Sequence, residues 1–87
     1  MALLSPKVIA QVSVRSDHEL GVMSWEWIMR ADGQVLYRLA TVNGRRERGP
    51  WTLVTRLPAA EMEAIGGEKA RAAETLDLIV SRHGYRR

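Results

Sequence analysis

The chain has 87 residues, of which 46% are hydrophobic and none is cysteine, and it carries 13 Lys and Arg residues against 10 Asp and Glu. This length supports one domain, near the lower size at which an apolar core suffices without disulfides or metals. The lack of cysteine excludes disulfide bridges, thiolate metal sites and cysteine nucleophiles, and the apolar fraction excludes an intrinsically disordered chain. We therefore predict a single folded domain over residues 1–87.

The positive charge is unevenly distributed along the chain. Residues 1–57 hold eight basic and five acidic side chains, whereas residues 58–87 hold five of each. This excess favours an anionic partner such as nucleic acid, although a modest positive charge also simply keeps a small protein soluble. Residues 1–6 lack the pattern of a secretory signal, and no run approaches the roughly 20 apolar residues of a membrane span. We expect a cytoplasmic protein without membrane contact.

Residues 7–15 alternate between apolar and polar side chains, which predicts a strand with one buried face. The apolar set is Val8, Ala10, Val12 and Val14, and Ile9 is the exception on the polar side. Residues 16–21 are polar and end in glycine, so they predict a turn into a second strand over about residues 22–31.

Asp32-Gly33 predicts a two-residue type I′ turn, because this pair tolerates the positive φ that both central positions need. A third strand follows, and the turn sets Trp27 opposite Arg38 and Trp25 opposite Ala40. One face then carries the large apolar side chains Met23, Trp25, Trp27 and Met29. We interpret that face as core and not as an exposed platform for stacking bases, because exposing these groups would leave so short a chain little to bury.

The opposite face of this strand pair is mixed in character. It carries Ile28, Val35, Tyr37 and Leu39 among polar side chains, and no second helix is available to cover it. We predict that these four residues form an interface for a protein partner or for a homodimer. The alternative is scattered apolar surface residues, which are common on soluble proteins.

Asn43-Gly44 predicts a second tight turn, after which residues 51–56 form a fourth strand. Pro50 cannot donate a ladder hydrogen bond, so this strand belongs at an edge. A tight register would place Trp51 beside Leu36, on the tryptophan-rich face.

Residues 58–83 show helical spacing, interrupted by Gly66-Gly67. Pro58 suits a first helical turn, and Gly84 suits the position after a last turn. The apolar stripe comprises Ala72, Ala73, Leu76, Ile79, Val80 and His83. The predicted fold is therefore α+β: a four-stranded antiparallel β-meander over residues 7–56, followed by a C-terminal helical region over residues 58–83 that is kinked or split at Gly66-Gly67 and packs on the face of Trp25 and Trp27.

Few residues suit catalysis. His18 and His83 have no metal-ligand spacing with the acids around them, and Gly66-Gly67 lacks the Lys-Ser or Lys-Thr of a phosphate loop. Glu61 and Glu63 lie two apart on a helix and so point in different directions. We predict no metal, no cofactor and no enzymatic activity; a weaker alternative is an enzyme whose site assembles only across a dimer.

The most distinctive polar segment is Gly44-Arg45-Arg46-Glu47-Arg48-Gly49, which presents three guanidinium groups between glycines. Arginine binds phosphate through paired hydrogen bonds. We predict a small binding module that contacts nucleic acid or a nucleoprotein through a hairpin loop. The predicted contact residues are Arg45, Arg46, Arg48, Arg56, Arg30 and Lys7. The alternative is a solvent-exposed loop without a binding role, in which Glu47 forms an ion pair within the chain.

A second function is also compatible with this sequence. The chain is small, lacks catalytic groups and has an unclaimed mixed face, which together suit a protein-binding inhibitor or adaptor, such as the accessory proteins with which phages and mobile elements act on a host complex. No helix-turn-helix, zinc-finger or aromatic RNA-binding motif is present to decide between the two.

Overall fold

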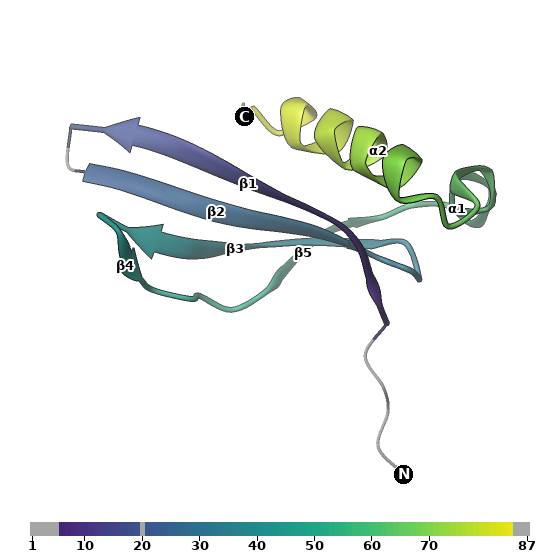
Figure 1. Ribbon diagram of the computed structural model, residues 1–87, viewed down its shortest axis with the longest axis horizontal. Coiled ribbons are helices and arrows are strands. Elements are labelled where there is room, and N and C mark those ends of the chain that lie inside the picture. The colour runs from purple at the N-terminus through teal and green to yellow at the C-terminus, as the bar shows by residue number, and fades with distance from the viewer. Residues whose placement is uncertain (1–5, 20, 85–87) are drawn as a thin grey trace, which may run out of the picture.

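The computed structural model describes residues 6–19 and 21–84 and shows an antiparallel sheet with two helices on one side (Figure 1). Predictions on residues 1–5 fall outside these ranges. The strands are β1 (Val8–His18), β2 (Gly21–Arg30), β3 (Gln34–Val42), β4 (Arg45–Arg46) and β5 (Thr52–Arg56), and the helices are α1 (Ala59–Ile65) and α2 (Lys69–Arg82). β1, β2 and β3 are neighbours in that order, while β4 and β5 pair with different parts of β3. The predicted α+β fold is confirmed.

The core lies between α2 and the face of β1 and β2 that carries the tryptophans. Trp27 is only 1% exposed, and its ring stacks on Tyr37 at 5.1 Å between centroids. The buried cluster consists of Val12, Val14, Trp27, Met29, Val35, Leu57, Ile65, Ala72, Leu76, Ile79 and Val80, with Trp25 partly buried against it. The interpretation of this tryptophan face as core is confirmed.

The predicted pairing of β2 with β3 is wrong by one residue over most of its length. Trp27 faces Tyr37, and Glu26 faces Arg38. The loop between the strands has three residues, because the Gly33 amide donates to the Arg30 carbonyl at 2.9 Å and Gly33 has a φ of 89°. A turn closed by a left-handed glycine is the usual three-residue hairpin loop. The extra loop residue moves each partner on β3 to the other face of the sheet.

This shift changes which residues lie on which face. Val35 is fully buried and Tyr37 packs against the core, whereas Ile28 lies on the side of the sheet away from α2, which we call the outer face. Leu39 pairs with Trp25 and so lies on the helix side. The prediction that Ile28, Val35, Tyr37 and Leu39 share one surface is therefore wrong.

Bulges at both ends of the sheet adjust the register. Ala40 is an extra residue on β3, so Met23 again faces Val42, as predicted. Ile9 is an extra residue on β1, and it packs against the core while Val8 is 43% exposed. The bulge accounts for the exception in the alternation of this strand, since an inserted residue reverses the orientation of those before it.

The second turn begins as predicted and then departs from the expected register. Asn43 and Gly44 both have positive φ, of 52° and 81°, and Thr41 pairs with Arg46 in the tight register. Residues 47–51 belong to no strand, although the Glu47 and Gly49 amides still donate to the Ala40 and Leu39 carbonyls of β3. Regular pairing resumes in β5, where Leu53 lies opposite Leu36. Trp51 is therefore not beside Leu36, and the Arg38 guanidinium lies over its ring.

The helical region is split at the two glycines, as predicted. Gly66 is left-handed at φ 59° and closes α1, and Gly67 also has positive φ. Of the predicted apolar stripe, Ala73 and His83 are exposed, because α2 rests on the sheet through the buried side chains Ala72, Leu76, Ile79 and Val80. In the described part of the chain, neither helix has the length and apolar character needed to cross a membrane.

Candidate nucleic-acid interface

The arginine-bearing turn between β3 and β4 is anchored to the start of β2 through Asn43. The Asn43 amide donates to the Val22 carbonyl at 2.7 Å, and the Asn43 side-chain oxygen accepts from the Val22 amide at 2.8 Å. Asparagine tolerates the left-handed conformation that this position requires. These two bonds hold the turn against the neighbouring hairpin, so the arginines that follow project from a fixed base.

We call Arg45, Arg46 and Arg48 the hairpin cluster. All three residues are exposed, as is Glu47 between them. The ion pairs recorded within residues 6–19 and 21–84 are Arg15 with Asp17, Arg38 with Glu26 and Arg71 with Glu68, and none of these includes a member of the cluster or Glu47. Glu47 therefore forms none of these ion pairs, so the internal pairing considered from the sequence is not seen in the described residues.

A row of polar side chains extends from the hairpin cluster across the outer face. The cross-strand pairs are Arg15 with Ser24, Ser24 with Thr41, and Thr41 with Arg46. Directly paired residues share a face of the sheet, and strands lie about 4.8 Å apart, so the two arginines are anchored about 14 Å from one another. The Ser24 and Thr41 hydroxyls are hydrogen-bonded at 2.5 Å. Because one hydroxyl serves as donor, the other keeps a proton that it can donate to a ligand.

Arg38 occupies the middle of the outer face, next to this row. Its Nε donates to the Glu26 carboxylate at 2.8 Å, and its guanidinium carbon lies 4.3 Å from the centre of the Trp51 ring. Both charged side chains are about a quarter exposed or less. The guanidinium is thus held by an anion on β2 and by an aromatic face in the segment that precedes β5, a combination in which arginine is not replaceable by lysine.

We expect a double-mutant cycle on Arg38 and Glu26 to give a coupling energy of about 1 kcal/mol, because the pair is partly shielded and hydrogen-bonded. The variants are Arg38→Met and Glu26→Gln, measured by urea unfolding. The pair Arg15 and Asp17 is the matched control: its side chains are 73% and 74% exposed and 3.4 Å apart. We expect a coupling near zero there, and equal couplings for the two pairs would contradict this account of the outer face.

The remaining predicted contact residues lie at the other end of the sheet. Arg56 pairs with Gln34 at the start of β3, whereas Arg46 pairs with Thr41 near its end. Seven residues of extended strand separate the two positions by about 24 Å. Arg30 is half-buried and donates to the Gln34 side chain at 3.5 Å, and the Lys7 side chain is exposed near the same end. The six predicted residues therefore form two groups, as the positions of β4 and α1 at opposite ends of the sheet show (Figure 1).

The structure adds three residues to the candidate site that sequence reasoning did not include. Arg15, Ser24 and Thr41 come from three different strands and meet only through cross-strand pairing. The predicted register already sets Ser24 opposite Thr41 and Thr41 opposite Arg46, because the extra loop residue and the bulge at Ala40 cancel at these positions. The pairing of β1 that brings Arg15 beside Ser24 was not predicted.

Other kinds of site find little support in the part of the chain that the structure describes. Within residues 6–19 and 21–84, no three His, Asp or Glu side chains are grouped as metal ligands. The exposed residue His83 has its ring 5.7 Å from that of Trp27, where it covers the edge of the core. In comparisons with known proteins, no family model, no curated protein and no solved structure matches this chain.

Proposed function

We propose that this protein binds the sugar-phosphate backbone of nucleic acid through the hairpin cluster and the row of polar side chains beside it. The observation that carries the proposal is the row itself, in which Arg15, Ser24, Thr41 and Arg46 align across four strands. Guanidinium and hydroxyl groups are the side chains that most often donate to phosphate oxygens, and such contacts position a protein without reading sequence. We therefore expect binding with little sequence preference.

The charges at this end of the sheet favour an anionic ligand. The arginines at this end of the sheet are Arg15, Arg38, Arg45, Arg46 and Arg48, and the acids are Asp17, Glu19, Glu26 and Glu47. Arg45 pairs with Val42, which pairs with Met23, so Arg45 lies on the helix side whereas Arg46 lies on the outer face. Glu26 is occupied by Arg38, and the exposed contact of Asp17 with Arg15 is weak enough to be exchanged for phosphate. The uncompensated charge is concentrated on the hairpin cluster.

The test measures affinity for labelled mixed-sequence single- and double-stranded DNA and RNA over a series of salt concentrations. We expect the triple variant Arg45→Ala, Arg46→Ala and Arg48→Ala to bind about 100-fold more weakly at low salt, or roughly fivefold for each arginine. The slope of log K against log salt should fall by about one for each phosphate contact removed.

Lys69→Ala is the matched charge control, because Lys69 is exposed at the start of α2 and outside the outer face. It should lower affinity only slightly. Arg15→Ala tests the row independently of the hairpin and should weaken binding several-fold. Undetectable binding to all four probes at low ionic strength would refute the proposal, as would a triple variant that binds like the parent protein.

A protein-binding adaptor or inhibitor is the second candidate, and one observation favours it. Ile28 pairs with Leu36, and Leu36 with Leu53, so an apolar row crosses three strands of the outer face. Ile28 and Leu36 are buried, and Leu53 is the exposed member, at 54%. If Leu53→Arg abolishes binding to a partner protein captured from the host while the triple arginine variant still binds that partner, this second function replaces the first.

A further inference from the structure

β1 forms the edge of the sheet that lies opposite β4 and β5. It pairs with β2 along its length, and within residues 6–19 and 21–84 no strand pairs with its other side. After the bulge at Ile9 the strand is regular, and residues 10–18 contain neither proline nor lysine. Proteins commonly place these residues on an edge strand because they hinder pairing with another chain. The β1 edge is therefore open to a further strand.

The hydrogen bonds of β2 show which residues of β1 direct their backbone groups to this open edge. The Val22 carbonyl accepts from the Asn43 amide on the β3 side, whereas the Ala31 amide donates to the Lys7 carbonyl on the β1 side. Successive residues of a strand turn their backbone groups to opposite neighbours, so the even-numbered residues of β2 face β3. Their partners on β1 must face outward. These partners are Gln11, Ser13, Arg15 and Asp17.

The side chains of these four residues are exposed on the outer face of the sheet. Arg15 pairs with Ser24 and is the last member of the row of polar side chains that begins at the hairpin cluster. The row therefore ends at the open edge. A strand added to β1 would continue the outer face beyond Arg15.

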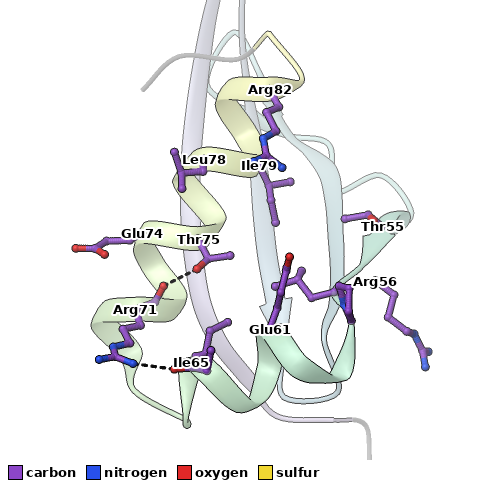
Figure 2. Close-up of a pocket in the computed structure, with 13 residues that line it drawn as sticks. Thr55, Arg56, Glu61, Ile65, Arg71, Glu74, Thr75, Leu78, Ile79 and Arg82 are labelled. Carbon is purple, nitrogen blue, oxygen red and sulfur yellow. Dashed lines mark hydrogen bonds between the residues drawn. The ribbon is translucent and has the colours of Figure 1, made fainter.

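The position of α2 leaves space for a second copy of the chain at this edge. α2 has 14 residues and is about 21 Å long, whereas the 11 residues of β1 span about 36 Å. In Figure 1, α2 lies beside the first half of β1, and the second half extends past its C-terminal end. In Figure 2, the Thr75 and Ile79 side chains point from α2 toward β5, away from this edge. A two-fold axis near the middle of β1 thus sets the two helices at opposite ends of the joined strands.

The backbone alternation limits how two copies of β1 can pair. Only residues that face the edge exchange hydrogen bonds, so an odd-numbered residue must lie opposite an odd-numbered one. A two-fold axis at Arg15 would place two guanidinium groups directly opposite each other, which is destabilising. An axis at Ser13 would set the bulge at Ile9 against Asp17. An axis at Val14 avoids both and pairs the whole regular stretch, residues 10–18.

In this register the β1 edge is complementary to itself. Asp17 lies opposite Gln11 of the second copy, whose amide donates to a carboxylate. Arg15 lies opposite Ser13 of the second copy, whose hydroxyl accepts from a guanidinium. The two Arg15 side chains are only diagonal neighbours, and each contacts Asp17 of its own chain at 3.4 Å. No two like charges are directly opposed.

We infer that two copies of this chain pair antiparallel through β1, about a two-fold axis at Val14, and form one continuous sheet. The axis is perpendicular to the sheet, so both rows of polar side chains lie on the same side of the dimer. A strand spacing of about 4.8 Å places the two Arg46 residues about 34 Å apart. This distance is about one turn of duplex DNA. If the proposed function holds, on which this last step rests, the dimer contacts duplex phosphates one turn apart through both hairpin clusters.

Sedimentation equilibrium of the full chain without nucleic acid tests the dimer. We expect a reversible monomer–dimer equilibrium. Ser13→Pro should raise the dissociation constant at least tenfold, because it removes an amide that faces the open edge in each copy and leaves the bonds with β2 in place. Ser13→Ala is the matched control, since it keeps the amide, and it should dimerise like the parent chain. Circular dichroism establishes that both variants are folded.

Charge changes at position 11 test the register. Gln11→Asp would set carboxylates directly opposite each other twice in the dimer and should weaken it about fivefold, whereas Gln11→Arg should strengthen it by a similar factor. Combining Gln11→Asp with Asp17→Arg restores opposite charges and should recover the affinity. These variants also decide the matter if Ser13→Pro does not fold.

Binding to duplexes of increasing length tests the joint use of both hairpin clusters. We expect the affinity of the parent chain to rise steeply between about 8 and 16 base pairs, because only the longer duplexes span one helical turn, and Ser13→Pro should lose this step. A parent chain that stays monomeric, or that dimerises unchanged with Ser13→Pro, would overturn the inference. Dimerisation without the length step would refute the joint use of the clusters. A dimer that binds no nucleic acid would refute the proposed function alone.

Discussion

Replacing Trp27 by alanine is expected to lower the free energy of unfolding by about 3–5 kcal/mol, the largest effect of any single substitution that we propose. The indole is 1% exposed, stacks on Tyr37 and lies 5.7 Å from the His83 ring, so its removal leaves a cavity under the end of α2. A domain of this size is stabilised by only about 5–15 kcal/mol in total. Urea unfolding followed by far-UV circular dichroism measures the loss.

Trp51→Ala is the matched control, because this tryptophan lies on the outer face against Arg38 and has no helix above it. We expect it to lose about 1 kcal/mol. If Trp27→Ala leaves no cooperative transition, Trp27→Phe provides the measurement. It keeps an aromatic ring against Tyr37 and should lose about 1–2 kcal/mol. Equal losses for Trp27→Ala and Trp51→Ala would contradict the placement of the core.

Gly33→Ala is expected to be the second most damaging change, with a loss of about 2–4 kcal/mol. Gly33 has a φ of 89°, which disfavours any residue with a Cβ by about 1–2 kcal/mol. A Cβ there would also lie 3.1 Å from the Leu57 carbonyl oxygen and 3.1 Å from the Met62 side chain. The Leu57 amide donates to the Gly33 carbonyl at 2.9 Å, so the two backbone segments cannot easily separate.

Gly44→Ala separates backbone strain from this close approach. Gly44 has a similar φ of 81°, but a Cβ added there meets no atom within 4 Å. We expect a loss of only about 1–2 kcal/mol for Gly44→Ala in the same unfolding measurement. If the two alanine variants lose equal stability, the contact of the Gly33 turn with Leu57 contributes nothing, and the three-residue loop would need another explanation.

The close packing at Gly33 also explains why the loop between β2 and β3 has three residues. The hairpin turn between β2 and β3 lies against the segment that leads from β5 into α1, where Leu57 is buried. The Gln34 amide donates to the Asp32 side chain at 3.1 Å, which stabilises the turn locally. The turn that sets the faces of the sheet is thus held by contacts with residues more than 20 positions away in the chain.

Local sequence patterns determined the type and order of the elements. The alternation in residues 7–15, the glycine-containing turns at Gly33 and Gly44, and the break at Gly66-Gly67 each depend on backbone preferences of a few neighbouring residues. The burial of Trp27 also followed from the sequence, because so short a chain has few other large side chains with which to build a core. These features need no knowledge of what lies across the sheet.

Tertiary structure decided which residues share a surface. One additional loop residue beside Asp32 places Val35 and Tyr37 on the core side of β3 and Arg38 on the outer face. The bulge at Ala40 then restores the expected pairing of Thr41 with Ser24. A two-residue and a three-residue turn are both compatible with Asp-Gly, and they differ in stability by less than the packing of the faces that they expose or bury. The position of Arg38 on the outer face, between Glu26 and Trp51, follows from that choice, because a strand has only two faces and a shift of one residue exchanges them.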